Sequence, residues 1–263
     1  MNEPQATRDL AGAFQNYFTI TPALTSAERE LVYRIRHDVY CKDLGWEPIR
    51  PDGLETDAAD AHSVHCLLRK QGSSEPVGCT RLILAKQDGE LPFEESCRTT
   101  LDRTIVDPRI LPRGTIGEVS RLAVVSAYRQ RKGEQNAPMT SMSETNFGED
   151  ERLPRFPFIP VSLYLAAAAV ARRLQVEHVF VLTEPRLASH FTRIGFDIRC
   201  VGSAIEHRGS RVPSLLSSSK VVENLRPMIR PLYDIVQQSV EMAFNRHPEA
   251  IDALKANGWQ PQA

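Results

Sequence analysis

The feature that most constrains the fold is the apolar segment VSLYLAAAAVA, Val161 to Ala171, which lies between two strand-like segments. The first strand-like segment, GEVSRLAVV, begins at Gly117, and the second, HVFVL, spans 178–182. The unbroken Ala run predicts a closely packed helix over 160–175. A strand, a crossover helix and a second strand form a parallel pair whose helix covers the sheet. The apolar run is also well short of the ~20 residues that span a bilayer.

The preceding segments predict an antiparallel part of the same sheet. Thr25 and Glu28 form a capping box ahead of a helix over about 26–42, in which apolar residues recur at four-residue spacing. Strand-like segments at 63–70 and 77–85 are separated by the turn-rich QGSSEP, as in a hairpin. We therefore expect a mixed sheet with helices on both faces.

After the 178–182 strand, EPRLASHFTRIGF predicts a short helix, FDIRCVG a strand, and HRGSRVP a turn into another strand. The tail from 221 to 263 is expected to be helical, with Pro227 and Pro231 limiting its first part. We expect one domain over 1–220, carrying a polar, aperiodic and mobile insert at 132–156, with a helical extension at 221–263 packed on it.

Charge and cysteine content exclude several function classes. The 263 residues carry 32 basic and 33 acidic side chains, so the chain lacks the overall positive charge that is typical of nucleic-acid-binding proteins. The five cysteines are odd in number and include no CxxC pair, which is typical of reduced thiols in a cytosolic protein. The N-terminal sequence lacks a signal-peptide pattern, so we expect a cytoplasmic protein.

A set of charged and aromatic motifs points to a particular chemistry. RIRHDVYCKDLGW, LETDAAD, GCTRLIL, LPF and GEVSRLAV follow one another over the first half of the chain. Their order and spacing resemble those of acyl-homoserine-lactone synthases, the autoinducer synthases. The motif residues that match are Arg36, Trp46, Asp57, Asp60, Arg81, Phe93, Glu118, Ser120 and Arg121.

The second half, with LTEPRLASHFTRIGF, resembles the closing part of the GNAT N-acyltransferase fold. The whole chain resembles acyltransferases associated with the PEP-CTERM/exosortase system and, more distantly, long-chain N-acyl amino acid synthases. These resemblances imply a GNAT-like α/β fold and transfer of an acyl group from a pantetheine thioester to an amine. They imply no tightly bound cofactor.

Acyl transfer to an amine requires a base, because the amine is protonated at neutral pH. We expect Glu118 to be this base, with Ser120 and Arg121 beside it. The cations Arg36, Arg81 and Arg121 and the anions Asp57, Asp60 and Glu118 are expected to form a balanced, paired network that holds a zwitterionic amino acid. Trp46 and Phe93 are expected to supply apolar walls.

We expect the acyl donor to bind at the other end of the strand that begins at Gly117. The resemblance places the backbone donor for the oxyanion near Leu122 to Val124. The segment YRQRKGE has one glycine, Gly133, where acetyltransferases have a Gly-rich pyrophosphate loop, so an acyl carrier protein fits better than coenzyme A. Arg129, Arg131 and Lys132 would meet its phosphate or its acidic surface.

Other interpretations stay open at this point. Asp57, Asp60, His62 and His65 contain metal-ligand residue types, but two carboxylates and an HxxH beside a strand are typical of loop caps, so no metal is predicted. His65 alternates with apolar residues, as an outward strand residue does. An acetyl-CoA-dependent acetyltransferase and a non-catalytic acyl-carrier or acyl-lipid binding module are the competing functions.

Overall fold

We describe residues 3–129 and 158–262 of the chain in a computed structural model. The predicted insert at 132–156 lies outside these described residues, as do Arg131 and Lys132.

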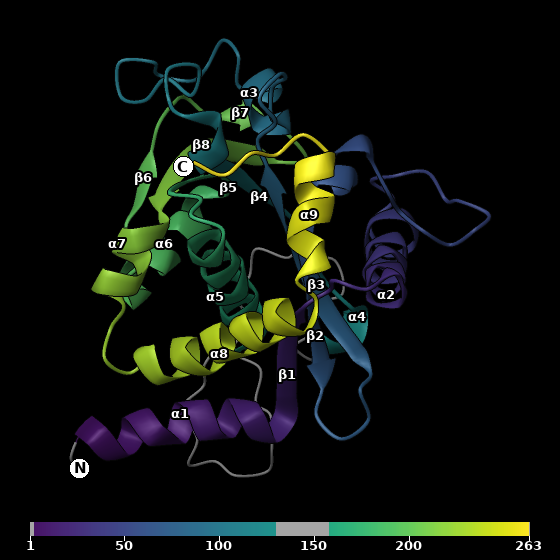
Figure 1. The fold of residues 1–263 in the computed structure, drawn as a ribbon. Helices are drawn as coiled ribbons and strands as arrows, with labels where there is room; N and C mark the ends of the chain where they lie inside the picture. The colour runs from purple at the N-terminus through teal and green to yellow at the C-terminus, as the bar shows by residue number, and fades with distance from the viewer. Residues whose placement is uncertain (1–2, 130–157, 263) are drawn as a thin grey trace.

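The described strands form one eight-stranded sheet in the order β1-β2-β3-β4-β5-β8-β6, with β7 paired to β8 (Figure 1). Pairing is antiparallel throughout except between β4 and β5, which run parallel. The predicted mixed sheet is thus confirmed. The strands are β1 (Phe18–Pro22), β2 (Ser63–Lys70), β3 (Pro76–Leu84), β4 (Ile116–Val124), β5 (His178–Thr183), β6 (Ile198–Cys200), β7 (Ile205–Glu206) and β8 (Ser210–Ser217).

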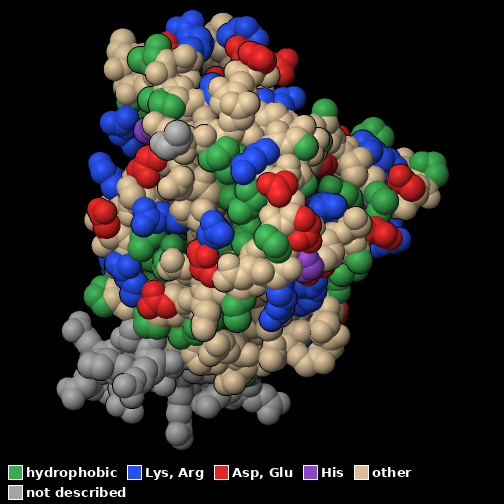
Figure 2. All heavy atoms as spheres, in the orientation of Figure 1, with side chains coloured by type: hydrophobic (Ala, Val, Ile, Leu, Met, Phe, Trp, Pro, Cys, Tyr) green, Lys and Arg blue, Asp and Glu red, His purple; other side chains and the backbone are tan. Residues whose placement is uncertain are grey.

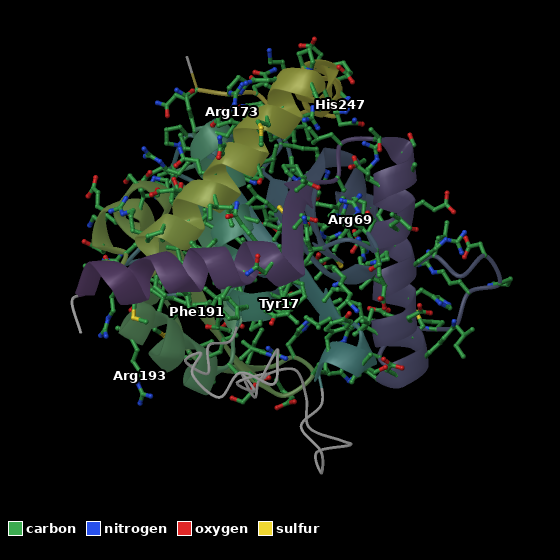
Figure 3. All side chains as sticks on the ribbon, turned by 90° about the horizontal axis from the view of Figure 1, so that it is seen from below. Tyr17, Arg69, Arg173, Phe191, Arg193 and His247 are labelled. Carbon is green, nitrogen blue, oxygen red and sulfur yellow. The ribbon has the colours of Figure 1, made fainter. Side chains whose placement is uncertain are left out.

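Helices cover both faces of the sheet, as predicted. Figure 3 shows α1 and α8 on one side and α2 on the other. The described α-helices are α1 (Glu3–Tyr17), α2 (Ser26–Arg36), α3 (Pro92–Ser96), α4 (Ser126–Arg129), α5 (Phe158–Arg173), α6 (Pro185–Ile194), α7 (Ser218–Asn224), α8 (Arg230–Arg246) and α9 (Glu249–Ala256). A π-helical segment spans His37–Asp43, and 3-10 turns span Ala58–His62 and Arg113–Thr115.

Successive side chains of β2 point to opposite faces of the sheet, and each face carries its own hydrophobic core. Cys66 and Leu68 pack under α5 and α8, whereas Leu67 packs under α2. The Ala-rich helix α5 is buried along most of its length, because its small side chains let it approach the sheet closely. In the part of the chain that the structure describes, no helix is both long and apolar enough to cross a membrane.

Most predicted elements are confirmed, and two N-terminal ones were missed. The Thr25–Glu28 capping box begins α2, but regular α-helix ends at Arg36 and a π-helical segment continues to Asp43. Sequence reasoning made no prediction for 1–24, where α1 and β1 lie. The β1 sequence FTITP does carry an alternating burial pattern, with Phe18 and Ile20 in the core.

A bulge in β4 positions the site. Cys79 pairs with Ala123 and Arg81 with Ser120, so Arg121 and Leu122 together lie opposite Thr80. Arg121 has φ of 53°, a left-handed conformation that is costly for a residue with a side chain. Pairing of β4 with β5 ends at Val119 and Val181. Beyond that point a cavity lies between the two strands.

Candidate active site

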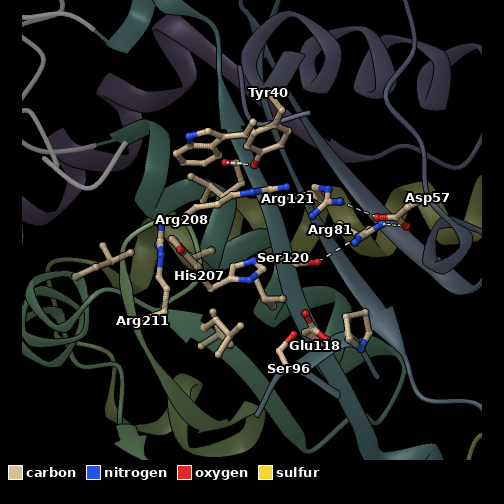
Figure 4. Close-up of a pocket in the computed structure, with 18 residues that line it drawn as sticks. Tyr40, Asp57, Arg81, Ser96, Glu118, Ser120, Arg121, His207, Arg208 and Arg211 are labelled. Atoms are coloured by element: carbon tan, nitrogen blue, oxygen red, sulfur yellow. Dashed lines mark hydrogen bonds and ion pairs between the residues drawn. The ribbon is translucent and has the colours of Figure 1, made fainter. Parts of the chain in front are cut away.

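The cavity lies where β4 loses its parallel partner, and it has a volume of about 340 Å³. This is within the range of small-molecule sites. Seven of the predicted site residues line it: Trp46, Asp57, Arg81, Glu118, Ser120, Arg121 and Leu122 (Figure 4).

Glu118 is a buried carboxyl group at the cavity wall, 5% exposed. Its Oε2 accepts a hydrogen bond of 2.9 Å from the Phe93 backbone N–H. Burial raises the pKa of Glu118 to about 7, although that hydrogen bond and the nearby Arg81 and Arg121 oppose the rise. The carboxyl is therefore poised to exchange a proton near neutral pH.

One wall of the cavity and the core behind it hold a network of three arginines and three carboxylates. Arg36 donates from Nε to Glu55 and from Nη1 to Asp60 Oδ1 at 2.6 Å. Arg81 Nη1 donates to Asp57 and Asp60, both at 2.6 Å. Arg36 and Arg81 are 0% and 2% exposed, so these two guanidiniums are held out of water.

Arg121 joins the network from the bulge. Its Nε lies 3.3 Å from Glu55 Oε1, and its Nη2 lies 3.0 Å from Asp57 Oδ2. Burial opposes ionisation of Asp57, but the Arg81 and Arg121 guanidiniums outweigh it and hold the pKa of that carboxyl below its usual range. The network is therefore charge-balanced, as a buried cluster must be.

The identity of the third anion differs from the prediction. Glu118 has no ion pair within 4 Å among the described residues, and Glu55, which sequence reasoning did not single out, takes that place. Glu55 stands two residues before Asp57 in LETDAAD, so its proximity to the motif was the available signal. The physical consequence is that Glu118 is left outside the ion pairs that would hold it ionised.

His65 is buried rather than outward-facing, at 0% exposure. It pairs with Arg81 across β2 and β3, and its ring packs edge-on against Tyr33 at 5.4 Å. Burial and then Arg36 lower the pKa of His65 to about 3, so the ring is neutral although its Nε2 lies 3.5 Å from Asp60. Among the described residues no group of three or more metal-ligating side chains is gathered.

The two aromatic residues predicted as apolar walls lie in different surroundings. Trp46 is half-buried, lines the cavity and stacks on Tyr40 at 5.9 Å between ring centroids. Tyr40 Oη donates to the Leu122 carbonyl at 2.7 Å, which ties the π-helical segment to the bulge. Phe93 does not form a cavity wall: it is 1% exposed and stacks on Phe180 at 4.2 Å, and its backbone serves Glu118 instead.

The predicted donor residues are dispersed. Leu122 lines the cavity, whereas the Val124 side chain points to the α5 face and packs in the core. Arg129, at the end of α4, forms an ion pair with Asp43. Arg36 and Asp60 lie behind the lining as part of the buried network.

Sequence reasoning assigned no site residue to one whole wall of the cavity, which is formed by β5, α5, α6, and β8 with the turn before it. Although LTEPRLASHFTRIGF resembles part of a known fold, these segments meet the predicted site residues only through the sheet order β4-β5-β8. The lining residues of this wall are Tyr164, Val181, Leu182, Leu187, His207, Arg208 and Arg211.

Comparison with known proteins agrees with the fold. Residues 35–137 match the acetyltransferase (GNAT) domain family model. None of the curated protein sequences compared with the chain matches it significantly.

Three solved structures share the fold at low sequence identity. TofI, in a ternary complex with an inhibitor and MTA, is 20% identical, with TM-score 0.53, covering 80% of this chain and 97% of TofI. BjaI, a CoA-dependent acyl-homoserine lactone synthase with SAM and isopentyl-CoA, is 18% identical, with TM-score 0.54 and coverages of 84% and 89%. FeeM, an N-acyl amino acid synthase from uncultured soil microbes, is 12% identical, with TM-score 0.52 and coverages of 79% and 94%.

The domain match, the mixed sheet and these neighbours agree with one another. The chain has the GNAT-like acyltransferase fold.

Proposed function

We propose that the protein is an N-acyltransferase that moves a medium or long acyl group from a pantetheine thioester to the amine of an amino acid or related metabolite. The observation that carries this proposal is a buried carboxyl, Glu118, with a pKa of about 7 at the wall of a cavity that also has an apolar side. The GNAT domain match and the resemblance to N-acyl amino acid synthases support the same reaction.

Glu118 acts as the base. It removes a proton from the acceptor ammonium, and the free amine attacks the thioester carbonyl, forming a C–N bond and a tetrahedral oxyanion. The backbone N–H of Leu122, at the bulge, stabilises this oxyanion. The C–S bond then breaks, and the thiolate, whose conjugate thiol has a pKa of about 8.5, departs with little help from an acid and takes up the second proton of the attacking nitrogen, so that the products are the amide and the free thiol.

The two sides of the cavity match the two substrates. The apolar lining of Leu122, Val181, Leu182 and Leu187 suits an acyl chain, and an acetyl group would leave this surface in water. The polar side, with Asp57 and Glu118, suits an amine. A longer chain is therefore favoured over acetyl.

The acyl donor is a carrier-protein or coenzyme A thioester, and MesI and BjaI, which share the fold, are CoA-dependent synthases. An acyl carrier protein as partner, an association with the PEP-CTERM/exosortase system and a cytoplasmic location stay predictions from the sequence.

The test is thiol release by the purified protein from dodecanoyl-CoA, dodecanoyl-acyl carrier protein and acetyl-CoA, each with a panel of amines. We expect release with a dodecanoyl donor, and a loss of roughly 10²–10⁴ in kcat for Glu118→Gln. Glu95→Gln, an exposed carboxylate on α3, is the matched control and keeps full activity. Release from acetyl-CoA alone would identify an acetyltransferase, and no release from any donor would favour a binding module.

A further inference from the structure

The arginines of this network cannot serve as the receptor for a substrate carboxylate. Arg36 and Arg81 are 0% and 2% exposed, and their guanidiniums already donate to Glu55, Asp57 and Asp60. Arg121 lines the cavity, but its Nε and Nη2 already lie 3.3 Å from Glu55 and 3.0 Å from Asp57. Displacing one of these carboxylates would leave a buried charge without its partner, which costs several kcal/mol. An anionic group of the substrate therefore needs another cation.

The opposite wall of the cavity supplies two such cations. Arg208 and Arg211 both line the cavity, with side chains 28% and 17% exposed. Arg208 forms an ion pair with Glu47, and Arg211 Nη2 lies 3.1 Å from Glu184 Oε1. Unlike Arg36 and Arg81, both are in contact with the solvent that a ligand would displace.

The turn that carries Arg208 is built to hold it over the cavity. Arg208 has φ of 54° and Gly209 has φ of 100°, so the turn places a non-glycine residue in a costly conformation. The Gly209 N–H donates to Glu206 Oε1 at 2.9 Å, which fixes this turn. The Arg208 guanidinium lies 5.5 Å from the Trp46 ring centroid.

Glu47 links this turn to the catalytic side. It contacts Arg208, and its Oε1 also lies 3.7 Å from Arg121 Nη2. A ligand carboxylate that takes the place of Glu47 on Arg208 would leave Glu47 beside Arg121, so Glu47 is not left without a cation. This exchange keeps the charge of the cavity wall balanced.

We propose that Arg208 and Arg211 form the carboxylate subsite of the cavity, so that the acceptor is an amino acid with a free carboxylate. This inference rests on the proposed N-acyltransferase function and names its acceptor class. Planar guanidiniums suit a carboxylate because they donate two parallel hydrogen bonds. Figure 4 shows Arg208 and Arg211 on one side of the cavity and Glu118 on the other, with His207 and Ser120 between them. A zwitterion bound by its carboxylate would thus direct its ammonium toward Glu118.

The test measures binding without turnover. By calorimetry, N-decanoylglycine and its methyl ester are each titrated into the wild type, Arg208→Gln, Arg211→Gln and Arg193→Gln. Arg193 is an exposed arginine of α6 outside the cavity lining and serves as the control (Figure 3). We expect the acid to bind the wild type roughly tenfold or more tightly than the ester. That ratio should fall toward one in Arg208→Gln and Arg211→Gln but persist in Arg193→Gln.

Three results overturn the proposal. The first is an acid that binds the wild type no more tightly than the ester does, or no binding of either compound. The second is an acid-to-ester ratio that survives both Arg208→Gln and Arg211→Gln. The third comes from coenzyme A titrated into the same four proteins: if both cavity substitutions weaken its binding and leave the ratio unchanged, the two arginines bind the donor phosphate instead. Arg211→Gln keeps the test valid if Arg208→Gln disturbs the strained turn. Failure of the proposed function is a separate result, because it would appear as no thiol release while the acid still binds through Arg211.

Discussion

Glu55 should be a major stabilising residue, although it belongs to no recognised motif position. Its carboxylate is 2% exposed and contacts Arg36 and Arg121. Glu55→Gln keeps the shape but removes the charge, leaving Arg36 with Asp60 as its remaining close anion. Breaking a buried pair costs about 3–5 kcal/mol, and because Asp60 stays we expect the lower end, about 3 kcal/mol.

The assay is urea unfolding, supported by thermal unfolding, in which about 3 kcal/mol corresponds to a fall in Tm of roughly 6–12 °C. The control is Glu30→Gln, which removes the solvent-exposed Arg34–Glu30 pair on the surface of α2 and should cost at most about 0.5 kcal/mol. If Glu55→Gln loses no more stability than Glu30→Gln, the network is not held together by its charges and the reasoning is wrong.

Three further predictions concern stability. Burial raises the pKa of Glu118 from 4.5 to about 7, so the folded protein binds a proton that the unfolded chain releases between these values. The stability of the wild type relative to Glu118→Gln should therefore fall by about 3 kcal/mol as the pH rises across that interval, and a flat difference in urea titrations would contradict this. Trp259 is 1% exposed, so Trp259→Ala should cost about 3–5 kcal/mol by urea unfolding, and a loss below about 1 kcal/mol would show that the C-terminal tail is not anchored there. Gly195→Ala should destabilise the protein more than Gly209→Ala in thermal unfolding. Both glycines have φ of 100°, but an added Cβ would lie 2.3 Å from the Asn224 carbonyl oxygen at Gly195 and would have no neighbour within 4 Å at Gly209. Equal losses of stability would show that φ alone decides the cost.

The overall distribution of surface charge does not indicate a binding site. Figure 2 shows basic and acidic side chains interspersed on the face it draws, which agrees with the near-zero net charge. Local clusters, such as the turn with Arg208, therefore carry the electrostatic argument.

The sequence by itself determined the elements and their order. Periodicity and capping predicted α2, the β2–β3 hairpin and the α5 crossover between parallel β4 and β5, because these signals depend on neighbours in the chain. Four residues of the ordered motifs line one cavity: Asp57, Arg81, Glu118 and Arg121.

Only the tertiary structure decided how these charges pair and what faces them. Glu55 replaces Glu118 as the third anion because the β4 bulge turns Arg121 toward Glu55 and Asp57, while Glu118 accepts from the Phe93 backbone. Arg208 and Arg211 reach the cavity because β8 pairs with β5. Such contacts join residues far apart in the sequence, and the physical reason is that burial and charge balance depend on all neighbours in space.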